Sequence, residues 1–162
     1  MATSYQHFLD KFPSLKLPVT LKEEDAHTYS AENQPLPHKL IGEFILPYEE
    51  EVDEFTEYVP CFKLSGTKNF DAIVYWKAGL LNYQYVMLTL GKGGKAIDKK
   101  VIAGTFSDGQ IITRSVARID DDMSIFIMSG QASRTDEKYN ASQSTTIELE
   151  ILPDGKLIEL VE

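Results

Sequence analysis

The residues from Phe70 to the C-terminus place the strongest constraint on how this chain can fold. Apolar and polar residues alternate there with a period of two, and turn sequences rich in Gly and Asp recur at intervals of roughly ten residues. The pattern is typical of an antiparallel meander. The predicted strands cover residues 70–77, 80–90, 96–103, 110–119, 123–131, 145–152 and 156–161.

The first 69 residues lack this alternation and instead carry three helical signals. Residues 3–12 place aromatic and apolar side chains on one side of a short helix. Thr20 and Glu23 fit a capping box, which predicts a helix over about 21–30. A proline at the first turn and helical spacing of apolar residues predict another short helix over 37–45.

These signals together predict one mainly β domain with some helix, an α+β fold, over residues 1–162. Residues 1–69 would form a helical or irregular cap, and residues 70–162 would form the meander. A flat sheet with free edges invites pairing between molecules. We therefore expect the meander to bend into a curved sheet or to close into a small barrel, capped by the N-terminal helices.

The charge of the chain excludes several classes of partner. The chain has 16 Lys and Arg residues and 25 Asp and Glu residues, which gives a net charge of −9. Such a field repels phosphate backbones and anionic lipid headgroups, so we expect neither nucleic acid nor a membrane as partner. The single cysteine, Cys61, excludes an internal disulfide, and its apolar neighbours predict a buried thiol. The chain shows no signal-like start and no long apolar span, so we expect a cytoplasmic protein.

No local motif predicts a cofactor, a metal or catalysis. The segment GKGGKA at 91–96 has the outline of a dinucleotide-binding turn, but the residues after it are too few for a crossover helix. A glycine-rich hairpin explains it better. His7, His27 and His38 lack metal-ligand spacing. We predict no cofactor and no metal site, and an enzyme with spatially assembled residues is the least favoured hypothesis.

Residues 49–57, here called the acidic segment, hold six acidic residues and no Lys or Arg. Such a run is usually a solvated linker. The functional alternative is a docking strip for a basic protein, with Val52 and Phe55 as apolar anchors. The candidate partner-binding residues are Glu49, Glu50, Glu51, Asp53, Glu54 and Phe55.

Aromatic residues lie on two strands that we expect to be neighbours. They either fill the core or line a pocket, since large rings serve both purposes. If Trp76 faces the interior, Tyr75 should face outward, because adjacent residues of a strand take opposite faces. The candidate ligand-binding residues are Trp76, Tyr83, Tyr85 and Met87.

Three segments of the chain carry a resemblance to a known family. FPSLKLP at 12–18, YVPCF at 58–62 and VYWKAGLL at 74–81 resemble an uncharacterised family of bacterial proteins from Bacteroidetes, over most of the chain. These motifs are not chemical signatures. The resemblance implies a bacterial origin and a shared fold, and it transfers no catalytic residue.

The leading functional hypothesis is a non-enzymatic bacterial domain that binds another protein. One version is an immunity protein that neutralises a basic toxin domain by charge complementarity. The alternative is a small-molecule carrier whose β-barrel closes around a ligand in an aromatic-lined pocket.

Overall fold

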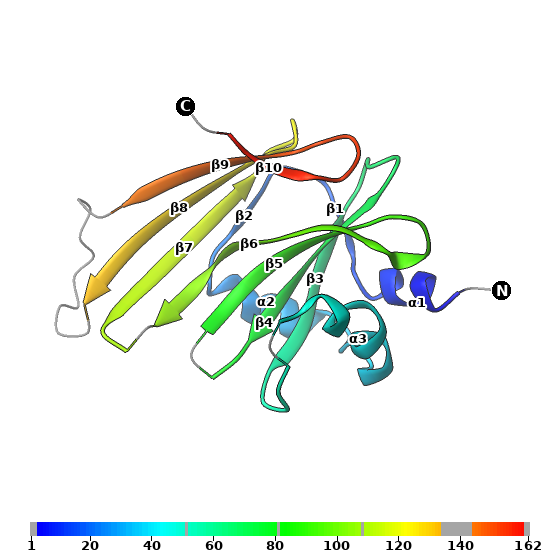
Figure 1. The fold of residues 1–162 in the computed structure, drawn as a ribbon, viewed down its shortest axis with the longest axis horizontal. Coiled ribbons are helices and arrows are strands. Elements are labelled where there is room, and N and C mark those ends of the chain that lie inside the picture. Colours follow the sequence, from blue (N-terminus) through cyan, green and yellow to red (C-terminus); the bar gives the residue numbers. More distant parts are fainter. Residues whose placement is uncertain (1–2, 51, 81, 108, 134–143, 161–162) are drawn as a thin grey trace.

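The computed structural model describes residues 3–50, 52–80, 82–107, 109–133 and 144–160 (Figure 1). Its elements are α1 (Ser4–Asp10), β1 (Ser14–Leu15), β2 (Val19–Leu21), α2 (Asp25–Glu32), α3 (His38–Phe44), the 3₁₀ helix η1 (Leu46–Tyr48), β3 (Glu57–Leu64), β4 (Asp71–Ala78), β5 (Asn82–Leu90), the 3₁₀ helix η2 (Lys92–Gly94), β6 (Ala96–Ser107), β7 (Ile111–Ile119), β8 (Ser124–Ser133), β9 (Thr145–Ile151) and β10 (Leu157–Leu160). None of the helices in these residues is long and apolar enough to cross a membrane.

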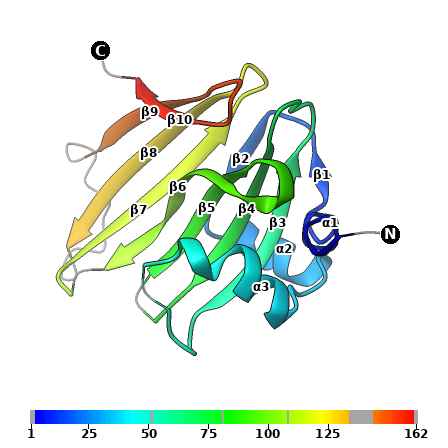
Figure 2. The same cartoon turned by 45° about the vertical axis from the view of Figure 1, so that its right-hand side comes forward.

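The predicted meander is confirmed. Strands β4 to β10 follow one another in a single antiparallel path, and β1 and β3 extend it on the β4 side. The largest difference in bounds is at β6, which continues to Ser107 instead of ending near residue 103. The sheet is strongly curved but open, since its path begins at β1 and ends at β10 without closing into a barrel (Figure 2).

A glycine marks the place where β6 separates from β7. Gly104 has a φ of +144°, and a Cβ atom there would collide with the carbonyl oxygen of Tyr83. The pairing of β6 with β7 covers Gly104 to Ser107. Beyond it, β2 pairs with β7 at Ala117 to Ile119. The N-terminal part of the chain therefore supplies the neighbour that β6 no longer provides.

The prediction of a helical or irregular cap over residues 1–69 is wrong in part, because this region contributes three strands. β3 pairs with β4 along its length, with a register shift between Pro60 and Phe62. β1 runs parallel to β3, with Ser14 opposite Lys63. β3 shows no period of two because both of its faces are covered, and a strand buried on both sides has a nearly continuous apolar sequence.

The predicted capping box at Thr20 is also wrong. Thr20 lies in β2, opposite Arg118, and the helix α2 begins only at Asp25. Leu21 is fully buried in the core, so tertiary packing overrides the local helical signal. A capping box is present instead at the start of α1, between Thr3 and Gln6. The predicted helices over 3–12 and 37–45 are confirmed as α1 and α3.

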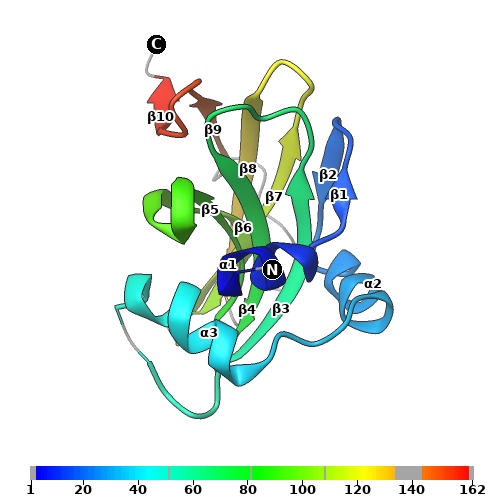
Figure 3. The ribbon, with the colours of Figure 1, turned by 90° about the vertical axis from the view of Figure 1, so that its right-hand side faces the viewer.

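Two hydrophobic cores lie on opposite faces of β3, β4 and β5. Helices α1 and α3 cover one face, while α2 and β2 cover the other (Figure 3). Tyr75 packs in the first core and Trp76 in the second, so the predicted opposition of these two rings is confirmed. The expectation that Tyr75 faces outward is wrong, because helices cover its face and leave it fully buried.

Candidate functional site

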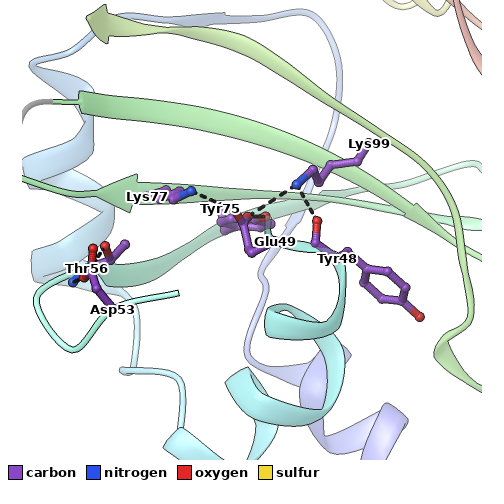
Figure 4. Close-up of polar contacts among 7 residues, drawn as sticks. All are labelled: Tyr48, Glu49, Asp53, Thr56, Tyr75, Lys77 and Lys99. Carbon is purple, nitrogen blue, oxygen red and sulfur yellow. Dashed lines mark hydrogen bonds and ion pairs between the residues drawn. The ribbon is translucent and has the colours of Figure 1, made fainter. Parts of the chain in front are cut away.

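The acidic segment begins with a carboxylate that is not solvated. The Glu49 side chain is 4% exposed, and its carboxylate accepts a 2.5 Å hydrogen bond from the Tyr75 hydroxyl and a 2.7 Å bond from Lys77 Nζ (Figure 4). Lys99 Nζ lies 3.7 Å from this carboxylate and donates to the carbonyl oxygen of Tyr48. The structure therefore places Glu49 in an internal network and not on a docking surface.

The tyrosine in this network stays protonated over a wide pH range. Burial raises the pKa of Tyr75 well above its ordinary value, and the negative charge and hydrogen bond of Glu49 raise it further. The phenol is therefore a permanent donor at physiological pH. Together with the two lysines it fixes the start of the acidic segment against β4 and β6.

A tight turn fixes the middle of the acidic segment. Asp53 Oδ1 accepts hydrogen bonds from the backbone N–H groups of Phe55 and Thr56 and from the Thr56 hydroxyl, each at 2.8 Å. Figure 4 shows Asp53 beside Thr56. The bond from the Thr56 hydroxyl, followed by that from the Phe55 N–H, lowers the pKa of Asp53. The turn leaves Phe55 62% exposed and Val52 55% exposed.

The other acids of the segment differ from Glu49. Glu50, Glu54 and Glu57 are exposed, as is Asp53 apart from its role in the turn. Glu51 lies outside the described residues. Of the predicted partner-binding residues, Glu50, Asp53, Glu54 and Phe55 are thus placed at the surface.

A groove of about 640 Å³, here called the edge groove, borders this segment. It lies beside residues 57–60 of β3, and β1 pairs farther along that strand, at Lys63 and Leu64. Its lining includes the apolar side chains Leu36, Ile41 and Val59 and the acidic residues Asp53, Glu54 and Glu57. Asn33 also lines the groove, and its Nδ2 donates to the carbonyl oxygens of Pro60 and Cys61, at 2.7 and 3.0 Å.

One residue that lines the edge groove has an unpaired polar group. The side-chain hydroxyl of Tyr58 is buried and has no hydrogen-bond partner among the described residues, and the residue as a whole is 9% exposed. Burial raises the pKa of Tyr58 to about 12, with a further contribution from the carboxylates of Glu49 and Asp53. A buried polar group without a partner costs stability.

A second cavity, of about 430 Å³ and here called the aromatic cavity, lies between α2 and strands β3 to β5. Trp76 and Tyr83 both line it, with their rings nearly parallel at an angle of 18° and their centroids 6.1 Å apart. Apart from these two rings, the polar residues of its lining are Glu23, His27, Ser30 and Glu57. The two cavities adjoin, since both are lined by Ser30, Glu57 and Val59.

Only two of the four predicted ligand-binding residues reach this cavity. Tyr85 and Met87 are fully buried in the core, and the Tyr85 hydroxyl donates to the carbonyl oxygen of Lys22 at 2.7 Å. Glu23 and Glu57 were not predicted to lie beside the rings. Recognition of β3 as a strand could have identified Glu57. Alternate residues of a strand share one face, so Glu57 lies on the same face as Val59, which is paired with Trp76.

The described residues offer little for metal binding or covalent catalysis. They contain no group of three His, Cys, Asp or Glu side chains placed to hold a metal ion. Cys61 is 1% exposed, which confirms the predicted buried thiol, and burial raises the pKa of that thiol well above its ordinary value. A thiol in this state is a poor nucleophile.

Comparisons with known proteins provide no relative from which a role could be transferred. The resemblance to the bacterial family therefore stays a prediction, because no protein-family model, no curated protein and no solved structure matches the chain.

Proposed function

We propose that this protein binds a basic protein partner, without catalysing a reaction, through the acidic segment and the edge groove beside it. The observation that supports this most strongly is the conformation of the acidic segment. Val52 and Phe55 are more than half exposed, and the Glu50 and Glu54 side chains of the same segment are exposed as well. Glu49 and the Asp53 turn hold this segment in place. Exposed apolar side chains surrounded by charge are typical of interaction surfaces.

Charge complementarity favours a basic partner. The net charge of −9 and the exposed carboxylates of Glu54 and Glu57 attract positive surfaces and repel acidic ones. Fixed loops also lose less conformational entropy when they bind. One form of the proposal is an immunity protein of bacterial origin, whose binding would inhibit a basic toxin domain at equimolar concentration.

The test compares three tagged proteins as baits in a lysate of the source organism, namely wild type, a Val52→Ser/Phe55→Ser double variant and a Met128→Ser/Leu160→Ser double variant. The last is the control, because Met128 and Leu160 are also exposed apolar residues but lie on β8 and β10. Proteins retained by wild type and control but lost from the first variant are then purified. Their affinity for the three proteins is measured by calorimetry at low and raised salt.

We expect the Val52→Ser/Phe55→Ser variant to bind the partner roughly 10- to 100-fold more weakly than wild type, since a few central apolar residues carry most of the binding energy in an interface. The affinity should fall as salt rises, because salt screens the attraction between exposed charges. Equal binding by all three proteins, or retention of the same proteins by all three baits, would overturn the proposal.

A second candidate function is the binding of a small molecule in the aromatic cavity. The stacked pair of Trp76 and Tyr83 favours it, as does the volume of the cavity, which lies in the range of small-ligand sites. Saturable quenching of Trp76 fluorescence by a compound from a metabolite set, with no effect of that compound on partner binding, would support this candidate over the first.

A further inference from the structure

We infer that the aromatic cavity is a binding site for a guanidinium group, and that it receives an arginine side chain of the basic partner. The inference rests on the proposed function for the source of the arginine. The chemistry of the cavity itself is argued from its lining residues, and its first test needs no partner.

The aromatic wall of the cavity is held in place. Trp76 is 7% exposed, and it packs against Tyr85 at a centroid distance of 4.7 Å with an angle of 62°. Tyr83 is 39% exposed and lies nearly parallel to the Trp76 ring. The faces of such rings carry negative potential and attract cations, and the flat guanidinium group stacks on them better than an ammonium group does.

Two carboxylates complete the site. Glu23 precedes α2 and Glu57 begins β3, so the two acids come from segments far apart in the sequence. Glu23 Oε2 accepts a 3.1 Å hydrogen bond from the Thr105 hydroxyl, which holds this side chain toward β6. No Lys or Arg is among the described residues that line the cavity. A guanidinium group would supply the missing positive charge and could bind a carboxylate through two parallel hydrogen bonds.

The remaining lining suits the aliphatic part of an arginine. Ala26, Val59 and Ala78 line the same cavity as the rings and the acids. Arginine places its methylene stem along apolar surface while its head reaches polar groups. Because Glu57 and Val59 also line the edge groove, a partner seated there is adjacent to the aromatic cavity.

The first experiment uses Trp76 as reporter, because it is the only tryptophan of the chain. Its fluorescence is followed at pH 8, where an ordinary histidine is neutral, during titration with Nα-acetyl-arginine methylamide. The matched probe is the citrulline analogue, which has nearly the same shape but no charge. We expect saturable quenching by the arginine compound and a flat response to the citrulline compound.

Substitutions then connect the signal to the carboxylates. Glu57→Gln and Glu23→Gln should each raise the dissociation constant of the arginine compound roughly 3- to 10-fold, as expected for loss of one charged hydrogen-bond partner. Glu54→Gln is the control, because Glu54 lines the edge groove and not the aromatic cavity. Equal responses to the arginine and citrulline compounds, a signal that rises linearly without saturation, or quenching by neutral sugars alone would overturn the assignment.

The second experiment measures the affinity of the purified partner for the Glu23→Gln variant. Glu23 is chosen because it lines the aromatic cavity but not the edge groove. Weaker partner binding, together with the same loss when one partner arginine is replaced by alanine, supports the inference. If the arginine compound binds but Glu23→Gln leaves partner binding unchanged, the site takes a free guanidinium compound and the assignment to a partner arginine is wrong. A partner that depends on Val52 and Phe55 but not on Glu23 would leave the proposed function standing while overturning this inference.

Discussion

Tyr75 donates a 2.5 Å hydrogen bond to the carboxylate of Glu49. From the sequence alone, Glu49 looks like the exposed acids that follow it. The bond joins the first residue of the acidic segment to the centre of β4, beneath α1 and α3. It sets the position from which the exposed part of the segment extends. The lysines at 77 and 99 balance the buried charge.

Replacing Glu49 with glutamine should therefore destabilise the fold. Lys77 and Lys99 would lose their shared counter-charge in a partly buried site, and we expect the free energy of unfolding to fall by about 2–3 kcal/mol. Urea denaturation followed by circular dichroism measures this change. Glu50→Gln is the control, and since Glu50 is exposed its effect should stay within about 0.5 kcal/mol. Equal effects of the two substitutions would contradict the network.

The two packed tyrosines Tyr58 and Tyr75 should respond oppositely to removal of the hydroxyl group. Their rings lie 5.9 Å apart, yet only the Tyr75 hydroxyl has a partner. We expect Tyr75→Phe to lower the free energy of unfolding by about 2 kcal/mol, because a charged hydrogen bond is lost. Tyr58→Phe should raise it by roughly 0.5–1 kcal/mol, because an unpaired buried hydroxyl is removed. Thermal and urea unfolding measure the free energy of unfolding of both variants. A larger loss of stability in Tyr58→Phe than in Tyr75→Phe would contradict this prediction.

Alkaline pH should unfold the protein in a predictable interval. Burial raises the pKa of Tyr29 and of Tyr58 to about 12, and it raises the pKa values of Tyr75 and Tyr85 further. In the unfolded chain tyrosine ionises near pH 10. Above that pH the folded state holds more protons than the unfolded state. The contribution of these tyrosines to stability is therefore fully present below about pH 10 and is lost as the pH rises toward 12 and beyond.

Absorbance at 295 nm tests this interval directly. Tyr29 and Tyr58 should ionise only near pH 12 or together with unfolding. Ionisation of all eight tyrosines near pH 10, in a chain that keeps its near-ultraviolet circular dichroism, would contradict the burial described above.

Two neighbouring glycines in the β5–β6 hairpin offer a test of helix packing on the sheet. Both have positive φ, +74° at Gly93 and +85° at Gly94. A Cβ atom on Gly93 meets nothing within 4 Å, whereas one on Gly94 would lie 2.6 Å from the Phe44 ring and 2.8 Å from the Tyr5 ring. We expect Gly93→Ala to cost about 1 kcal/mol and Gly94→Ala about 3 kcal/mol or more, the excess being steric. Similar melting temperatures for the two variants would contradict the contact of α1 and α3 with this hairpin.

Most of the strands that the sequence predicts correctly have one covered and one open face. β4 and β5 are covered on both faces, and the glycine-containing turns beside them identify them instead. In β9 the apolar Ile147, Leu149 and Ile151 alternate with glutamates, and the alternation identifies the strand. β1 and β2 span two and three residues and are defined by their distant partners, so no local period identifies them. β3 is covered on both faces, so its sequence does not alternate between apolar and polar residues, and it also contains a proline.

The candidate site shows a similar division. Trp76 and Tyr83 were identified because aromatic residues on adjacent strands are visible in the sequence. Nothing local distinguishes Glu49 from Glu50, since the difference arises from Tyr75, Lys77 and Lys99, which come 26 to 50 residues later in the chain. Burial of a charge depends on partners brought together by the fold, and a run of like residues does not reveal which member will have them.

The pairing of β2 with β7 also bears on how the protein emerges from the ribosome. Val19 is synthesised one hundred residues before its partner Ile119. At about 5–20 residues per second, that interval is about 5 to 20 s. During this time Leu21 lacks its partner in β7, Ala117. Residues 19–21 must therefore wait for β7, so a segment made before most of the sheet takes its place only after β7 has been made.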